Sequence, residues 1–255
     1  MNVVAIIQAR LASTRLPGKV LLDLEGRTVL ERVCDRVRAS KGICSVVVAT
    51  TVLDDDSKIF EFCGSAGIGV YRGSSEDVLD RFYQAAQLFK ADHVVRVTAD
   101  CPILDPRVID LVVERHLREG ADYTSNICPP TYPDGEDTEV MTVAALAQAW
   151  SQAKLKSDRE HVTTYIRNSK GLFRTANVTY ERDLSAKRWT LDNAEDYEFL
   201  RSIYHGLFSK NNLFGMEDVL SYLAAHPELE TINNHIRRNE GYTKSLKQDG
   251  ESFRS

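Results

Sequence analysis

The stretch QARLASTRLPGK, residues 8–19, gathers side chains suited to binding several phosphate groups. Arg10, Arg15 and Lys19 supply three cations, and hydrogen bonds from such groups to phosphate are stronger than neutral ones. Ser13 adds a hydroxyl donor, and a Pro-Gly pair predicts a tight turn just before Lys19. We call this stretch the basic loop. From its residues alone it predicts either a polyphosphate site or a solvated loop paired with surface carboxylates.

Two familiar phosphate-binding motifs are absent from this part of the sequence. No G-x-G-x-x-G follows the first apolar run, so the dinucleotide fingerprint is missing. Gly18-Lys19 is followed by Val20 and lacks the earlier glycine of G-x-x-x-x-G-K-[ST]. The basic loop therefore needs a different explanation.

A second chemical group stands at the end of a later apolar run. Asp100 follows VVRVTA, and ligands of open α/β sheets bind beyond the carboxyl ends of strands. A carboxylate there can hold Mg²⁺ together with substrate phosphates. The alternative is an Asp that only shapes the turn with Pro102. Asp192 precedes a later predicted helix. From the residues alone, the N-cap of that helix is an equally good interpretation of Asp192.

The elements that must position these residues alternate along the first half of the chain. Apolar runs predict buried strands, and apolar residues at helical spacing predict helices between them. Such alternation implies a doubly wound, mostly parallel sheet covered on both faces, which is an α/β fold. We expect strands at 3–7, 45–51, 69–73 and 93–100, and helices at 28–40, 55–66, 76–89 and 106–120.

After residue 120 the pattern changes, and we expect a small embellishment around 121–190 within a single domain of residues 1–255. The stretch 127–137 is rich in proline and predicts a long loop of the kind that often binds ligands. The polar tail, 239–255, is expected to fray. The remaining predictions are helices at 142–153, 158–168, 194–207 and 216–229, and strands at 173–180 and 185–193.

Composition limits the class of protein. The formal charge of −5 and the pI near 5.7 argue against non-specific binding of nucleic acid. Five scattered cysteines without a C-x-x-C indicate neither a disulfide framework nor a zinc site. No stretch approaches the roughly 20 apolar residues of a membrane span, and the start lacks a signal-peptide pattern. We expect a cytoplasmic protein that binds no membrane.

The string IIQARLASTRLPGKVL, residues 6–21, resembles the N-terminal signature of sugar cytidylyltransferases, closest to the spore-coat polysaccharide branch. The resemblance implies the doubly wound sheet of nucleotide-diphospho-sugar transferases, with the basic loop wrapped around the triphosphate of CTP. Arg10, Ser13, Arg15 and Lys19 would bind the nucleotide, and the three cations would also act in catalysis.

Further strings resemble the same family. VYRGSSEDVLDRF, residues 70–82, matches its R-G-S-x-x-D-V-L-x-R, which implies base recognition by Gly73 and Ser74. Ala49 and Thr50 are weaker candidates by the same analogy. The alternative for 70–82 is a helix capped by a serine, with acids in its first turn.

The resemblance also assigns a metal pair. TADCPILDP resembles the family's G-D-x-P-L-I, whose Asp is a metal ligand and catalytic, so Asp100 takes these roles. LDNAED resembles D-T-P-E-D, so Asp192 would be the second Mg²⁺ ligand. Thr98-Ala99 and Asn193-Ala194 depart from the family pattern, and the first departure fits the spore-coat branch. The acids at 54–56 also form a D-x-D, which we interpret as a solvated cap.

Acceptor residues come from two further strings. YPDGEDTEVMT resembles Y-P-D-G-x-D-x-E-V, and DREHVTTYI resembles E-R-E-H-V-T-x-Y-I. They imply an acceptor site with Asp134, Glu139, Arg159 and His161. The alternatives are an acidic surface loop and a structural histidine on a helix face.

The reaction implied is transfer of CMP from CTP to an acidic, nonulosonate-like sugar, with release of pyrophosphate, for surface polysaccharide biosynthesis. A glycosyltransferase using a ready-made nucleotide sugar and a non-catalytic nucleotide-binding protein remain the alternatives. Family members commonly dimerise, so a homodimer is expected.

Overall fold

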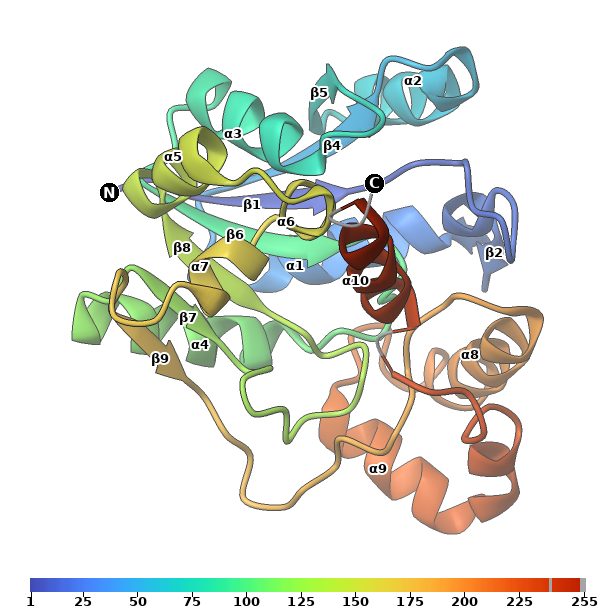
Figure 1. The fold of residues 1–255 in the computed structure, drawn as a ribbon. Helices are drawn as coiled ribbons and strands as arrows, with labels where there is room; N and C mark the ends of the chain where they lie inside the picture. Colours follow the sequence, from blue (N-terminus) through green and yellow to red (C-terminus); the bar gives the residue numbers. More distant parts are fainter. Residues whose placement is uncertain (239, 253–255) are drawn as a thin grey trace.

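The computed structural model describes residues 1–238 and 240–252, and these contain a central seven-stranded sheet (Figure 1). The strand order is β5-β4-β1-β6-β8-β7-β9. All neighbouring strands run parallel except that β8 is antiparallel to both β6 and β7. The strands are β1 (Val3–Gln8), β4 (Ser45–Thr51), β5 (Gly69–Gly73), β6 (His93–Thr98), β7 (Tyr123–Ser125), β8 (Glu139–Thr142) and β9 (Thr175–Asn177).

The central strand β1 is apolar because both faces of the sheet are covered. Ala5 and Ile7 enter one hydrophobic cluster, whereas Val4 and Ile6 enter the other. This alternation follows from the two-residue period of a strand. The continuous apolar run is thus typical of a buried parallel strand, as expected.

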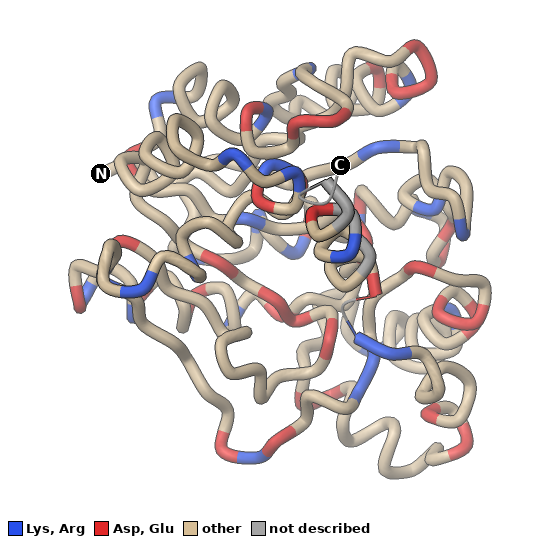
Figure 2. The backbone as a smooth tube through the Cα atoms, viewed as in Figure 1, with Lys and Arg blue, Asp and Glu red and all other residues tan. Residues whose placement is uncertain are grey.

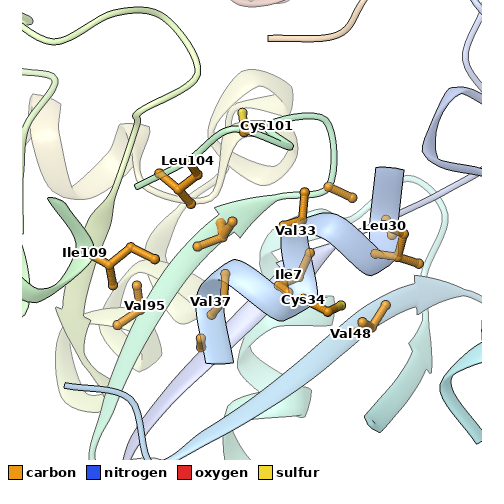
Figure 3. Packing of buried hydrophobic residues seen from close by; sticks show 14 of the residues in the cluster. Ile7, Leu30, Val33, Cys34, Val37, Val48, Val95, Cys101, Leu104 and Ile109 are labelled. Atoms are coloured by element: carbon orange, nitrogen blue, oxygen red, sulfur yellow. The ribbon is translucent and has the colours of Figure 1, made fainter. Parts of the chain in front are cut away.

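Helices cover both faces of the sheet, which confirms the predicted fold class. Figure 3 shows Val33 and Val37 of α1 packed near Ile7 and Val95 of the sheet. One face carries α1 (Val29–Ala39), α2 (Ser57–Ser65) and α4 (Pro106–Glu119). The other carries α3 (Val78–Leu88), α5 (Val143–Gln152) and the short helices α6 (Lys156–His161) and α7 (Thr164–Asn168).

A third hydrophobic cluster lies away from the sheet, around the buried Trp189. It joins α8 (Ala194–Leu207) and α9 (Met216–Ala225) to the first residues of α1 and α4. The division of the chain into one domain with a subregion at 121–190 stays a prediction. That subregion supplies β7, β8 and β9 to the central sheet.

Most predicted elements are confirmed with ends that differ by at most four residues, and four predictions are wrong. The helix expected at 55–66 is among those confirmed, and it begins at Ser57, after a 3₁₀ turn at Asp54–Asp56. The helix expected at 158–168 is broken at Val162, whose φ of 62° no α-helix allows. Of 173–180 only β9 is a strand, and 185–193 makes a single bridge, Asp134 to Arg188.

The described part of the tail is the other error, because it forms helix α10 (Glu240–Ser252) rather than fraying. Polar contacts with α6 hold it, and composition gives no sign of them. Residue 239 and residues 253–255 of the predicted tail lie outside the described residues.

The remaining elements are short. β2 (Asp23–Leu24) and β3 (Arg27–Thr28) form a hairpin after the basic loop, and 3₁₀ turns occur at Lys19–Leu21 and Pro227–Thr231. Among the described residues, no helix has both the length and the apolar character needed to cross a bilayer. Figure 2 shows acidic and basic segments interleaved over the visible face.

Candidate active site

The basic loop and Asp100 meet beyond the carboxyl ends of β1 and β6, which are neighbours in the sheet. The loop leaves β1 after Gln8, and Asp100 follows Thr98 at the end of β6. Gly18 has φ of 69°, a left-handed conformation that glycine adopts without strain, and it places Lys19 at the start of a 3₁₀ turn. The predicted Pro-Gly turn thus directs Lys19 back over the sheet edge.

Lys19 joins the two predicted metal ligands. Its Nζ lies 2.6 Å from Asp100 Oδ2 and 2.9 Å from Asp192 Oδ1. It also donates to the carbonyl of Leu191 at 2.7 Å. The Leu191 amide in turn donates to the Asp100 carbonyl at 2.8 Å, which fixes the two segments side by side. Two carboxylates far apart in sequence therefore share one cation.

This cluster perturbs the pKa values of its members. Burial disfavours the charged form of Lys19, but Asp100 and Asp192 outweigh it, so the pKa of Lys19 is raised. Burial also disfavours charged Asp192, but Lys19, Arg15 and Arg188 outweigh it and lower the pKa of Asp192 to about 2. Asp192 is thus a carboxylate at neutral pH, ready to bind a cation.

The other residues of the basic loop have separate neighbours. Arg15 Nη2 lies 2.8 Å from Asp192 Oδ1, and its Nη1 lies 3.0 Å from Glu240 Oε2 of α10. Ser13 Oγ accepts a weak hydrogen bond, at 3.4 Å, from the Leu16 amide. Arg10 is exposed, and its charge lies close enough to contribute to a lowered pKa of the buried Arg81.

The predicted base-binding residues lie at the same sheet edge, on β4 and β5. Ala49 is buried, and its carbonyl accepts from the Ala9 amide at 3.1 Å, which ties β4 to the basic loop. The hydroxyl of Thr50 is buried and has no hydrogen-bond partner among residues 1–238 and 240–252. A Cβ at Gly73 would lie 2.7 Å from the Tyr71 ring, so glycine is needed there. Base recognition stays a prediction.

Ser74 has the capping role that was the alternative interpretation. Its Oγ accepts from the amides of Asp77 and Glu76 at 3.0 and 3.3 Å, just before α3. Asp77 then accepts from the Asp80 amide at 2.8 Å. The nucleotide role of Ser74 stays a prediction.

The four predicted acceptor residues fall in different places. Asp134 lies 3.4 Å from Arg188, which also binds Asp192 at 3.2 Å, so it is linked to the metal pair. Arg159 is engaged elsewhere, because its guanidinium binds Asp77 at 2.5 Å and ties α6 to α3. Their acceptor roles stay predictions.

Glu139 is the first residue of β8, and His161 is the last residue of α6. Glu139 is buried and accepts from Tyr123 at 2.5 Å and from Thr163 at 2.6 Å, and it pairs with Arg96. His161 Nε2 lies 3.0 Å from Ser245 Oγ of α10. Glu139 is therefore the centre of a buried polar cluster, and His161 lies under the C-terminal helix.

Several residues of the site were not anticipated. Arg188 binds Asp192 and Asp196 and so orients the predicted metal ligand. Residues 188, 192 and 196 lie at four-residue intervals, but this spacing predicts pairing only within a helix, and α8 begins at Ala194. Glu240 carries no such signal, because its partner Arg15 lies 225 residues away.

The acids at 54–56 do not form a solvated cap throughout, because Asp56 is only 1% exposed. Its Oδ1 accepts from the Leu11 amide at 2.7 Å, and its Oδ2 accepts from the Thr51 hydroxyl. Asp56 is thus an anchor for the basic loop. This corrects the solvated interpretation and agrees with the rejection of 54–56 as a metal motif.

The donor set fits a magnesium ion. Asp100 and Asp192 direct carboxylate oxygens at one point, marked by the Lys19 ammonium. Among the described residues, no group of three or more His, Cys, Asp or Glu side chains could hold a metal. Mg²⁺ needs only one or two carboxylates where substrate phosphates complete its shell.

Comparison with known proteins agrees with this geometry. A model of the family described as Cytidylyltransferase matches residues 4–219. The spore coat polysaccharide biosynthesis protein SpsF of Bacillus subtilis is 33% identical over 236 residues, 90% of this chain and 97% of that one. A 3-deoxy-manno-octulosonate cytidylyltransferase of an Anaeromyxobacter strain is 29% identical over 214 residues, 80% of this chain and 85% of that one.

A solved structure is similar over nearly the whole fold. The structure of a cytidylyltransferase from Leptospira borgpetersenii superposes with a TM-score of 0.86 and 34% sequence identity. The match covers 90% of this chain and 96% of that chain. The family match spans the basic loop, both predicted metal ligands and the seven strands. The chain therefore belongs to the cytidylyltransferase family and is a CTP-dependent nucleotidyltransferase.

Proposed function

We propose that this enzyme transfers CMP from CTP to an acidic, nonulosonate-like sugar and releases pyrophosphate. The observation that carries the proposal is the convergence of Asp100 and Asp192 on Lys19 at the mouth of the basic loop. Carboxylates at this site suit the magnesium ion, and the neighbouring cations suit the phosphate groups of a magnesium triphosphate.

The step is a substitution at the α-phosphorus of CTP. An acceptor hydroxyl oxygen forms the new bond to phosphorus while the bond to the bridging β-phosphate oxygen breaks. The hydroxyl proton is lost to solvent, and the electron pair leaves with pyrophosphate. This chemistry depends on positioning and charge neutralisation, so the protein needs no covalent intermediate.

The side chains divide the work. Lys19 and Arg15, with Arg10, would neutralise the triphosphate and the departing pyrophosphate, where fixed cations stabilise developing charge. Asp100 and Asp192 would hold Mg²⁺, which when bound would polarise the α-phosphate. Arg188 would keep Asp192 in place, since it binds that carboxylate and the buried Asp196 together.

An acidic acceptor is supported by the two arginines beside Glu139. Arg96 pairs with Glu139, and attraction to the same carboxylate outweighs the effect of burial on Arg167, so the pKa of Arg167 is raised. Among the residues that the structure describes, the buried Nε atoms of both arginines have no hydrogen-bond partner. Buried donors without partners are rare in folded proteins, and a carboxylate of the acceptor would supply the missing acceptor atoms.

The names of the relatives suggest the biological setting. SpsF is named for spore coat polysaccharide biosynthesis, and a second relative is named for 3-deoxy-manno-octulosonate. We therefore extend the proposal to a cytoplasmic homodimer that activates a sugar for surface polysaccharide. Gly73, Ser74, Ala49 and Thr50 would bind the cytosine, and Asp134, Glu139, Arg159 and His161 the acceptor.

The test is pyrophosphate release in the presence of Mg²⁺, with each of four nucleoside triphosphates against a panel of acidic sugars and their neutral analogues. Release with CTP and one acidic sugar is the expected result. Release with a neutral analogue alone would contradict the acidic acceptor. Absence of CTP binding by calorimetry would contradict the role of the basic loop.

A further inference from the structure

Helix α10 lies beyond residues 4–219 that match the family, yet it reaches the nucleotide site. Its first residue, Glu240, lies 3.0 Å from Arg15 Nη1, while Arg15 Nη2 binds Asp192 at 2.8 Å. Figure 1 shows α10 beside α6. Glu240, which lies outside the residues matched by the family model, thus pairs with a cation of the basic loop.

The rest of α10 is attached to α6 by polar contacts. Ser245 Oγ lies 3.0 Å from His161 Nε2 and 2.7 Å from Glu160 Oε2. Asp249 Oδ1 accepts from the Ser157 amide at 3.2 Å. The Tyr242 ring meets the edge of His161 with 5.2 Å between centroids. These contacts attach α10 to the rest of the chain through one short helix, and a terminal segment attached in this way can open separately from the core of the fold.

The Glu240 contact conflicts with the nucleotide role of Arg15. A triphosphate bound to Arg15 would carry negative charge to the place where the Glu240 carboxylate now lies, and like charges repel at this range. The Arg15–Glu240 pair is also half exposed, with 38% and 48% of the two side chains accessible, so it is a weak contact that water can replace.

We propose that Glu240 sets the nucleotide affinity of this enzyme: it holds Arg15 in the nucleotide-free state, and the triphosphate displaces it and releases α10. The proposal rests on the proposed function, because it requires Arg15 to bind phosphate. By linkage, whatever loosens α10 strengthens CTP binding, and CTP binding loosens α10. Docked α10 also covers His161, so its release would open the predicted acceptor end after the nucleotide has bound.

Two variants measure the coupling. Glu240→Gln keeps the size of the side chain and removes its charge, so we expect CTP to bind about two- to fivefold more tightly, the range of an exposed ion pair. Asp249→Asn weakens the opposite end of α10 without touching Arg15, and a smaller gain is expected. Glu228→Gln is the matched control, because Glu228 is exposed and pairs with His226 rather than with the basic loop.

Hydrogen exchange of the α10 amides reports the release directly. The full-length protein is compared alone, with CTP and Mg²⁺, and with pyrophosphate, which offers the same charge without the nucleoside. Faster exchange in α10 with either ligand, together with tighter CTP binding by Glu240→Gln, is the expected result.

The outcomes separate the two proposals. If CTP binds while α10 exchange is unchanged or slower, the release of α10 is wrong and the proposed function stands. If pyrophosphate alone speeds exchange and CTP does not bind, the nucleotide assignment is wrong and the release stands. Unchanged or weaker CTP binding by Glu240→Gln overturns the role of Glu240, and failure of both ligands to bind overturns both proposals.

Discussion

The backbone amide of Leu11 donates a hydrogen bond to Asp56 Oδ1, 2.7 Å away, and this contact fixes the basic loop to the turn after β4. The second oxygen of Asp56 accepts from the Thr51 hydroxyl at the end of β4. One buried carboxylate therefore sets the path of the chain between the first strand and Arg15.

Asp56→Asn tests this anchor. The amide keeps the shape but has a single oxygen, so one of two buried donors loses its acceptor, and the free energy of unfolding should fall by about 1–3 kcal/mol. The KM for CTP should rise because the basic loop is less well positioned. Urea denaturation and a CTP titration measure the two effects, with the exposed neighbour Asp55→Asn as control. A normal KM in a destabilised variant would show that Asp56 acts on stability alone.

Lys19→Ala should slow pyrophosphate release by roughly 10²–10³-fold, the usual loss when one charge-stabilising donor is removed. The two carboxylates that Lys19 joins would then lie close together without their shared cation. Steady-state kinetics with saturating CTP measure the effect, and the exposed Lys58→Ala serves as the control. If the variant turned over within a few-fold of the wild-type rate, the catalytic role of Lys19 would be contradicted.

Asp100→Asn should lose most activity while the fold survives, because the amide preserves the hydrogen-bonding shape but removes the charge that a magnesium ion requires. Activity is measured across a magnesium titration, and circular dichroism follows the fold. The control is Asp35→Asn, which changes a half-exposed carboxylate of α1. Wild-type turnover at limiting Mg²⁺ would contradict the assignment of Asp100 as a metal ligand.

A buried histidine pair predicts acid sensitivity. Burial, with a smaller contribution from His93 at 2.9 Å, lowers the pKa of His116 to about 4. An unfolded histidine titrates near 6.5, so unfolding takes up a proton between these pH values. The contribution of His116 to the free energy of unfolding is therefore fully present above about pH 6.5. It is lost as the pH falls toward 4, by at most about 3 kcal/mol.

Urea denaturation from pH 4 to 7 measures this dependence. His116→Asn should flatten the curve between pH 4.5 and 6.5, whatever its effect on stability at pH 7. His205→Asn, at a position 88% exposed, should leave the slope unchanged. If the free energy of unfolding changed equally with pH in the wild type and in His116→Asn, the acid sensitivity would come from other groups.

Sequence patterns predicted the parallel half of the sheet because β1, β4 and β6 are mainly apolar runs and the helices between the strands each have one apolar face. They missed β7 and β8, which are short, and whose strand conformation depends on pairing such as that of Val140 with Val95. The break at Val162 was also missed. A β-branched residue disfavours positive φ, so surrounding contacts rather than local preference must impose it.

For the site, the basic loop and Asp100 could be located because they directly follow predicted strands. Asp192 could be paired with Asp100 only through family resemblance, since no local pattern links residues so far apart. The contact of Arg15 with Glu240 was beyond prediction for the same reason. The engagement of Arg159 by Asp77 likewise depends on how α6 packs against α3.

The reversed direction of β8 determines which segment of the chain can diversify. Because β8 is antiparallel to β6, Glu139 at its beginning lies beside Arg96, toward the nucleotide edge of the sheet. The long loop that precedes β8, residues 127–138, therefore ends at the sheet edge where the basic loop lies, and the turn after β8 lies at the opposite edge. Insertions or substitutions in that loop would alter the surroundings of the second substrate while strand register and the phosphate-binding groups stayed constant. A common nucleotide-activating scaffold can in this way evolve toward different sugars through one peripheral segment.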